Sequence, residues 1–543
     1  MVLNVVVYRV KVQGRYTYNY SLNPEIDYLY LKSTYNIKEL EVITPFIPFY
    51  IGKFALKIIK KASSKIKFIA SLEDRKITRA LKSLNIEKVS NKIIKGNSFP
   101  KESQINYVLN AIEDGIITID CLREKTQIKI NTENLYDVLQ VLYLKNKIKI
   151  KPIYGNDKKN KYCDICTEVC EECFLGYSSA DVLIYKEGTF NEKGRNNIVY
   201  KKSRIKEELV GFVDSIYQFT LSKNDNLVVS FPPIMKGVEL LYGAIYETLK
   251  SSGKVIYITS KENVFSVRDN IKSVIEGVDI YVFNKGLSFK NIDILICSYD
   301  SIPEFSEDFE LCILDDRISF INKPYNNIFF LCKKALKQKG KFINTSVVPL
   351  EYKLRFLKGS SMEIKIPPVN IKNPIPEPKF IISRYIDEKT VYLPDISLDM
   401  LKWSLREKSK MIIFTPNSRI SIHLKNYLLT VEEIKENIGI SSSKNREDYY
   451  SFLNGEKTIL ISSNYLDALE PIYNVNVVVM YSDSKSYTED VLLYMCNMAN
   501  DHTKKTFREA FFISNTESKN MLNAKSIIRS INKSAWENGY IGK

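Results

Sequence analysis

At 543 residues, of which 45% are hydrophobic, the chain is long enough for about three to five domains with apolar cores. It has no apolar run near the roughly 20 residues that span a bilayer and no signal-like amino terminus, so we expect a cytoplasmic protein without a transmembrane segment. Lys and Arg outnumber Asp and Glu by 79 to 63. The net charge of +16 favours nucleic acid or an anionic membrane face, although a Lys-rich composition alone gives the same surplus.

The first 155 residues predict two small regions. Residues 1–98 open with MVLNVVVYRVKVQGRY, whose alternation of apolar and polar residues predicts a strand, and continue into a basic stretch with apolar residues at helical spacing. Such a stretch suits DNA phosphates, a membrane surface or the solvated face of an α/β domain, so this N-terminal domain is assigned no role. Residues 99–155 predict short helices and then a strand, which indicates a small helical, winged-helix-like module.

Four of the nine cysteines gather in one short window of the next region, residues 156–200. They form two C-x-x-C pairs, and two such pairs make up the closed tetrahedral set that holds a structural zinc ion. The pairs are closer together than is usual for zinc sites, so an iron–sulfur cluster and four unliganded thiols stay open as alternatives. The predicted ligands of this metal module are Cys163, Cys166, Cys170 and Cys173.

From residue 201 onward the chain twice alternates helix with strand. NLVVSF, KVIYITS, DIYVF, DILICS, ELCILDD and KFINTS are short apolar runs typical of buried strands, with helical sequence between them. The prolines of NPIPEPKF interrupt the pattern, and KMIIFTP, KTILISS, VNVVVMYS and EAFFIS then restart it. Strands separated by helices form parallel sheets with helices on both faces. We therefore predict two α/β lobes, residues 201–373 and 374–543.

A cysteine-knuckle module followed by two α/β lobes resembles the ComFA family of late competence proteins, which are superfamily 2 helicase-type ATPases of DNA uptake. The resemblance covers roughly residues 105–543 and lies in the order and spacing of segments more than in identical catalytic residues. It implies two tandem RecA-like parallel-sheet lobes, binding of single-stranded DNA, and a cytoplasmic location that extends to the inner face of the membrane. Implied partners are a membrane DNA-uptake pore or other competence proteins.

The nucleotide loop of this family reads G-A-G-K-T-E, between a strand and a helix. Here VVSFPPIMKGVELLYGAI takes its place, and the resemblance makes Lys236, Gly237 and Glu239 the remnant of the loop. Lys236 stands one position early, Gly237 replaces the Lys, and Val238 replaces the Thr that binds Mg²⁺. The Pro-Pro-Ile-Met loop also lacks the glycines that allow a close approach to phosphate. The family implies ATP and Mg²⁺ as cofactors, and these replacements argue against them.

The later motifs of the family are also altered. LCILDDRISF stands where the family has D-E-V-D, so Asp315 and Asp316 are the catalytic remnants, and NTSVVP supplies Thr345 and Ser346 for the coupling motif T-A-T-P. The fifth motif, E-R-G, is replaced by Leu-Asp-Ala around Asp467. The sixth reads LYMCNMANDHTKK and lacks both finger arginines, the kind of residue that contributes about 10³–10⁵ in the rate of phosphoryl transfer.

The sequence thus favours a DNA-binding, helicase-like protein in which ATP hydrolysis is weak or lost. An active ATP-dependent translocase with a non-standard phosphate loop is one alternative. The other alternative is a protein-interaction scaffold without DNA affinity. In that case the positive charge reflects only a Lys-rich composition. With two histidines, His423 and His502, the chain has little material for histidine-based catalysis.

Overall fold

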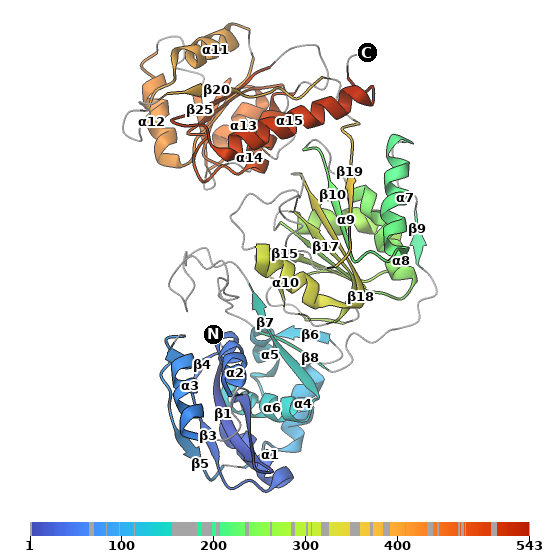
Figure 1. Ribbon diagram of the computed structural model, residues 1–543, viewed down its shortest axis with the longest axis vertical. Coiled ribbons are helices and arrows are strands. Elements are labelled where there is room, and N and C mark those ends of the chain that lie inside the picture. Colours follow the sequence, from blue (N-terminus) through green and yellow to red (C-terminus); the bar gives the residue numbers. More distant parts are fainter. Residues whose placement is uncertain are drawn as a thin grey trace. The chain divides into compact units, whose positions relative to one another are not determined.

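The computed structural model (Figure 1) describes residues 3–63, 70–82, 84–96, 98–112, 115–154, 182–186, 198–201, 207–233, 238–260, 263–283, 288–290, 292–299, 302–303, 305, 307–316, 325–347, 359–369, 373–383, 391–407, 409–431, 438–442, 445–464, 467–468, 472, 474–500 and 508–541. By proximity of Cα atoms the chain forms two compact units. One consists of Met1–Ser203, Ala244–Leu314 and Pro324–Phe342, and the other of Arg204–Gly243, Asp315–Lys323 and Ile343–Lys543. Over the described residues, no helix is both long and apolar enough to cross a membrane.

The N-terminal residues form an antiparallel sheet with helices packed against it. β1 (Asn4–Val12) and β2 (Arg15–Ser21) make a hairpin whose turn places Gln13 at φ 48° and Gly14 at φ 83°. Positive φ at both turn positions matches the twist of paired strands, and glycine adopts it without strain. The strand predicted at the amino terminus is confirmed. The remaining elements are α1 (Pro24–Tyr35), β3 (Leu40–Val42), β4 (Ile47–Pro48), α2 (Phe49–Ser63), α3 (Ala70–Lys82) and β5 (Asn91–Ile93).

The next region has the element order helix, strand, helix, helix, strand, strand. β8 pairs antiparallel with both β6 and β7 and therefore lies between them, which is the order and pairing of a winged helix. The segment that connects β7 to β8 carries the four cysteines of the predicted metal module and lies outside the described residues. The elements are α4 (Glu102–Ile112), β6 (Gly115–Thr118), α5 (Ile119–Thr126), α6 (Thr132–Leu144), β7 (Ile148–Tyr154) and β8 (Val182–Lys186), with β14 (Ser288–Lys290) and β16 (Ile302–Pro303) at the two edges of the sheet.

Helix α6, the third helix of this region, packs against the N-terminal sheet and shares one apolar core with it. Leu22 N donates a 3.0 Å hydrogen bond to Gln140 Oε1, and Asn23 Nδ2 donates one of 2.7 Å to Asp137 Oδ1. Tyr143 stacks on Tyr20 with ring centroids 5.4 Å apart. In helix-turn-helix proteins the last helix of the motif enters the major groove. Here the equivalent helix is used for internal packing.

A buried carboxyl group, that of Asp27 on α1, joins these two regions. It accepts hydrogen bonds from Tyr8 Oη at 2.7 Å, from Gln140 Nε2 at 2.7 Å and from Ser21 Oγ. Asp27 is fully buried, and this burial raises the pKa of its carboxyl to about 7 although the three donors act in the opposite direction. These hydrogen bonds connect β1, β2 and α1 to Gln140 of α6, which is 113 residues away from Asp27 along the chain.

The first parallel sheet has seven strands in the order β13-β15-β11-β17-β18-β10-β19. The pairs β10–β19, β11–β15, β11–β17 and β13–β15 are parallel. Helices α8 and α10 flank this sheet from opposite sides (Figure 1). Its strands are β10 (Asn226–Ser230), β11 (Val255–Thr259), β13 (Ile280–Val282), β15 (Ile294–Ser298), β17 (Phe309–Asp315), β18 (Leu336–Ser346) and β19 (Ser361–Lys365). Its helices are α7 (Glu207–Leu221), η1 (Val238–Leu241), α8 (Tyr242–Lys250), α9 (Val264–Val274) and α10 (Tyr325–Ala335), and β9 (Val199–Tyr200) pairs with β12 (Ile275–Glu276) beside them.

The second parallel sheet has six strands in the order β20-β25-β24-β21-β23-β22, and every pair is parallel. Neighbouring residues of one strand face opposite cores: Ile412 packs with α13, α14 and α15, whereas Ile413 packs with α11 and α12. The strands are β20 (Lys379–Ile382), β21 (Met411–Phe414), β22 (Ile438–Ser441), β23 (Ile459–Ser462), β24 (Asn476–Met480) and β25 (Ala510–Ser514). The helices are α11 (Asp395–Arg406), α12 (Ser418–Leu428), α13 (Glu447–Asn454), α14 (Glu489–Met498) and α15 (Lys519–Glu537).

The predicted fold class is confirmed as a mixed α/β chain with two parallel sheets, an arrangement that fits two RecA-like lobes. Each apolar run named above as a strand forms one. Cys297, Cys312, Cys332 and Cys496 are buried free thiols, and Cys121 is half-buried.

Candidate functional site

The two predicted catalytic remnants, Asp315 and Asp316, lie at the carboxyl end of β17 and are buried. Asp315 Oδ1 accepts a 2.7 Å hydrogen bond from Thr345 Oγ1 at the end of β18, and Asp316 N donates one of 2.9 Å to Thr345 O. Phe231 N, directly after β10, donates 2.8 Å to Ser346 O. The structure therefore brings the remnants of the acidic motif and of the coupling motif together, because their strands end at the same edge of the sheet.

The resemblance places Val238, the first residue of η1, where the family has a Thr that binds Mg²⁺. Val238 is buried there and offers no ligand atom, and the neighbouring Glu239 is exposed. Phosphate-loop enzymes hold Mg²⁺ between a loop hydroxyl and an Asp at the end of a strand, and only the Asp has a counterpart in Asp315. Among the described residues, Asp315 thus supplies the carboxylate of such a site, and Val238 supplies no hydroxyl. Lys236 and Gly237 lie outside the described residues.

The predicted zinc ligands, Cys163, Cys166, Cys170 and Cys173, also lie outside the described residues, so the metal module stays a prediction. Within the described part of the chain, no group of three or more His, Cys, Asp or Glu side chains is placed to hold a metal ion.

In the second sheet, polar residues follow the carboxyl ends of three adjacent strands. Phe414 at the end of β21 is in register with Ser462 of β23, which is in register with Ser441 of β22. Thr415 N donates a 2.8 Å hydrogen bond to Ser462 O, and Ser463 N donates one of 3.0 Å to Ser441 O. Polar residues thus stand side by side at one end of the strands, with Thr415, Ser441, Ser462 and Asn464 buried and Ser442 and Ser463 half-buried. We call this group the strand-end row and define it as Thr415, Asn417, Ser441, Ser442, Ser462, Ser463 and Asn464.

The buried carboxylate of Asp467 accepts hydrogen bonds from several side chains of the strand-end row. Its Oδ2 accepts 2.7 Å hydrogen bonds from both Ser441 Oγ and Ser462 Oγ, and its Oδ1 accepts one of 3.0 Å from Asn464 Nδ2. Arg446 Nη2 completes the set at 3.1 Å from Oδ1. The side chain of Asp467 is fully buried, and burial raises its pKa above the usual value despite these four donors. The acid therefore organises the ends of β22 and β23.

The amino end of α12 adjoins the row. Asn417 caps the helix, since its Oδ1 accepts from Ile420 N at 3.0 Å, and Thr415 Oγ1 lies 2.7 Å from Ser421 Oγ. Ser418 and Arg419 in the first turn are exposed. Helix amino termini carry unpaired N–H groups and partial positive charge, so they bind phosphate readily.

Two aromatic rings, those of Tyr449 and Tyr450, lie beside Arg446 near the strand-end row. Its guanidinium carbon lies 4.3 Å from the ring centroid of Tyr449 and 5.7 Å from that of Tyr450. Tyr449 is buried, but Tyr450 is 56% exposed. An exposed ring beside a cation is the kind of platform on which bases of single strands stack.

Sequence patterns alone did not identify this row. The signal was present, because FTPN, SSSKN and SSN each place Ser, Thr or Asn directly after a buried strand. Of the residues singled out in the degenerate fifth and sixth motifs, Asp467 is the buried anchor, whereas His502 and the lysines of HTKK lie outside the described residues. His423 is half-buried on α12, away from the row's polar contacts given above.

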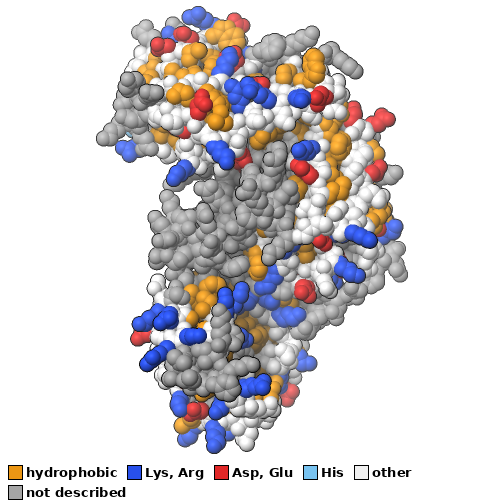
Figure 2. All heavy atoms as spheres, in the orientation of Figure 1, with side chains coloured by type: hydrophobic (Ala, Val, Ile, Leu, Met, Phe, Trp, Pro, Cys, Tyr) orange, Lys and Arg blue, Asp and Glu red, His pale blue; other side chains and the backbone are white. Residues whose placement is uncertain are grey.

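On the one face that Figure 2 draws, positive side chains do not gather in a single patch. On the face drawn in Figure 2, Lys and Arg side chains are scattered over both ends of the chain and alternate with acidic and apolar side chains. On this face the charge therefore does not mark a binding site, and the arrangement of specific groups carries more information than the net charge of +16.

Comparison with protein-family models finds no match. Among curated proteins, the chain is similar to the competence protein ComFA of Bacillus subtilis (strain 168), with 20% identity over 389 residues, which are 70% of this chain and 83% of that protein. Among solved structures, it is similar to the DUF1998 helicase MrfA bound to DNA, with 13% identity and a TM-score of 0.39 over 63% of this chain and 55% of that one. A single-residue variant of Dbp5 of S. cerevisiae, bound to RNA and ADP BeF3, has 12% identity and a TM-score of 0.37 over 62% of this chain and 98% of that one. The chain thus spans about half the length of MrfA.

Proposed function

We propose that this chain, a divergent ComFA-type protein resembling superfamily 2 helicases, binds single-stranded DNA along the strand-end row of its C-terminal lobe. The observation that carries the proposal is the accessible part of the row, where the half-buried Ser442 and Ser463, an exposed helix amino terminus with Arg419, and the Arg446–Tyr450 pair follow three adjoining parallel strands. Open α/β sheets bind ligands beyond the carboxyl ends of their strands. Hydroxyl, backbone N–H and guanidinium groups are the usual donors to nucleic-acid phosphates.

The proposed mode of binding is sequence-independent. Phosphate contacts fix the strand, and Tyr450 offers a stacking surface that accepts any base. Both sheets are proposed to be RecA-like lobes of a DNA-holding scaffold, with a zinc ion on the four clustered cysteines as a structural element. A membrane DNA-uptake pore or another competence protein is the proposed partner.

The first prediction concerns the salt dependence of DNA binding. The affinity for a fluorescein-labelled oligothymidine is expected to fall linearly with salt on a log–log plot, with a slope of about −0.7 for each phosphate contacted. Fluorescence anisotropy at a series of NaCl concentrations measures this slope. A flat response, or no binding at low salt, would favour the alternative of a protein-interaction scaffold.

The second prediction concerns ATP. We propose that hydrolysis is weak or lost, because Val238 stands in place of the Mg²⁺-binding hydroxyl and Asp315 is already engaged by Thr345. With single-stranded DNA and Mg²⁺ present, phosphate release is expected to stay at the level of the protein-free control, and calorimetry is expected to show no saturable binding of Mg·ATP. Turnover at motor rates that Lys236→Ala abolishes would contradict this and establish an active translocase.

A further inference from the structure

A separate pocket lies at the amino ends of strands of the second sheet, whereas the strand-end row lies at the carboxyl ends. It has a volume of about 500 Å³, within the range of about 300–1,000 Å³ of small-molecule and side-chain pockets, and is lined by Asp399, Met400, Trp403, Asn476 and Glu509. Asn476 is the first residue of β24, and Glu509 directly precedes β25. Because the strands are parallel, these amino ends lie across the sheet from the carboxyl ends that form the row.

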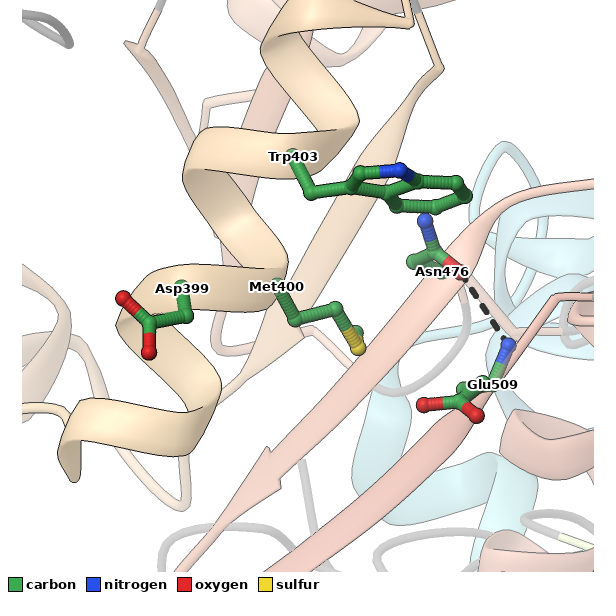
Figure 3. Close-up of a pocket in the computed structure, with 5 residues that line it drawn as sticks. All are labelled: Asp399, Met400, Trp403, Asn476 and Glu509. Carbon is green, nitrogen blue, oxygen red and sulfur yellow. Dashed lines mark hydrogen bonds between the residues drawn. The ribbon is translucent and has the colours of Figure 1, made fainter.

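The pocket has an aromatic wall and an acidic wall. In Figure 3, Met400 and Trp403 extend from α11 toward β24, and the carboxylate of Glu509 faces the same space from the strand side, whereas the carboxylate of Asp399 points away from them. Trp403 is 46% exposed, although an indole of this size is usually well buried. Asn476 holds the strand side in place, since its Oδ1 accepts from Glu509 N at 3.1 Å and its Nδ2 donates to Ser404 Oγ at 2.8 Å.

Only one of the two carboxylate oxygens of Glu509 has an interaction partner among the described residues. Lys379 Nζ contacts Oε1, and among the described residues no partner of Oε2 is present. Asp399 is exposed and makes no ion pair within the described part of the chain. The pocket lining itself contains no cation. In a protein of net charge +16, the lining of this pocket thus carries two carboxylates, of which Glu509 is paired with Lys379.

We propose that this pocket binds an arginine side chain presented by a protein partner. A guanidinium is planar, stacks on the face of an indole and can donate an N–H group to Oε2 of Glu509, so Trp403 and Glu509 together match it better than they match an ammonium. Met400 lines the remaining apolar wall against the aliphatic part of the side chain. Asp399 adds negative charge at the rim, which acts mainly by attracting the ligand.

The test uses a short peptide as a probe, in the full-length chain. The chain has two tryptophans, so Trp536→Phe, at an exposed position of α15, leaves Trp403 as the only indole. The probe is acetyl-Gly-Arg-Gly-amide, and the neutral isostere with citrulline in place of arginine is its control. Titration is expected to give a saturable change in Trp403 fluorescence with a midpoint on the order of 1 mM, and a midpoint at least tenfold higher for the citrulline peptide.

Substitutions of charged residues test whether the peptide binds at the carboxylate of Glu509. Glu509→Gln is expected to raise the midpoint at least tenfold, and Asp399→Asn two- to threefold. Lys379→Ala is expected to lower it two- to threefold, because it frees the carboxylate that Lys379 contacts. Glu377→Gln is the matched control, since Glu377 pairs with Arg529 outside the pocket and its loss is expected to leave the midpoint unchanged.

The proposal would be overturned by equal binding of the arginine and citrulline peptides, by no saturation at tenfold higher concentration, or by an unchanged midpoint in Glu509→Gln. Binding of acetyl-Gly-Glu-Gly-amide in place of the arginine peptide would also overturn it, since the neighbouring lysines would then govern the site. Concentration-dependent self-association lost in Trp403→Ala would make a second copy of this chain the occupant and would likewise overturn it. DNA binding along the strand-end row is expected to be unchanged in each of these cases, so the outcome is independent of the proposed function.

Discussion

Raising the pH from about 4 to about 8 is expected to destabilise the N-terminal part of the chain by about 4 kcal/mol through the single carboxyl group of Asp27. Its pKa is about 7 in the folded protein, against 3.8 for an unperturbed Asp. A rise of about 3 in pKa, at about 1.4 kcal/mol for each unit, gives this value as an order of magnitude.

The sign follows from which state holds the proton. Below a pH of about 4 both states are protonated, so Asp27 then contributes no penalty. Between about 4 and 7 the unfolded chain releases the proton while the folded chain keeps it, because ionisation would leave a charge in the shared core of α1 and α6. The stability is therefore fully present below the unfolded pKa and is lost as the pH rises through the folded pKa.

Hydrogen exchange of the full-length chain measures this effect locally. Peptides from β1, α1 and α6, corrected for the intrinsic pH dependence of exchange, are expected to lose protection as the pH rises. Asp27→Asn is the matched variant, because an amide does not titrate, and it is expected to abolish the trend. Peptides from β21 and β23 in the same sample serve as an internal control. Equal pH dependence in wild type and Asp27→Asn would contradict the assignment.

Asp467→Ala is expected to lower the free energy of unfolding of the C-terminal lobe by about 3–5 kcal/mol. The substitution removes the acceptor shared by Ser441, Ser462 and Asn464 and leaves Arg446 without its buried partner. Buried donors left unpaired carry the full cost of their desolvation. Because the same carboxylate holds the ends of β22 and β23, the loss is expected to reach the strand-end row and weaken DNA binding as well.

Asp483→Ala is the matched control for this substitution. Asp483 also accepts two hydrogen bonds, both of 3.2 Å and both from Thr516, but these lie at the surface. Its loss is expected to cost less than about 1 kcal/mol. Hydrogen exchange over β22 and β23 distinguishes the two variants. Equal protection in both would show that the Asp467 cluster does not stabilise the lobe.

The central strands of both parallel sheets were predictable, and three edge strands were not. β19, β20 and β22 lie at sheet edges. A central parallel strand is buried on both faces and shows a continuous apolar run, whereas β19 reads SMEIK with alternating exposure and β20 follows the prolines of NPIPEPKF. The signal that identified the other strands is therefore weak in these three.

The polar sites were harder to predict, because each depends on contacts between distant residues. Asp315 and Thr345 were singled out through motif order, and the structure places them in contact. Nothing in the sequence near Asp27 indicates that Gln140 would reach it. Trp403 likewise looks like an ordinary apolar position of an amphipathic helix, and only the packing of α11 beside Asn476 and Glu509 leaves its ring at a pocket.

The strand-end row is tested most directly by Arg419→Ala in the salt series with labelled oligothymidine. Arg419 is exposed in the first turn of α12, so its loss removes the proposed phosphate contact without disturbing a core. The affinity is expected to fall about three- to tenfold and the salt slope to become shallower by about 0.7, the contribution of one phosphate contact. Lys533→Ala on α15 removes the same charge elsewhere on the lobe and is expected to change neither quantity. Equal losses in the two variants would contradict a DNA site on this edge of the sheet.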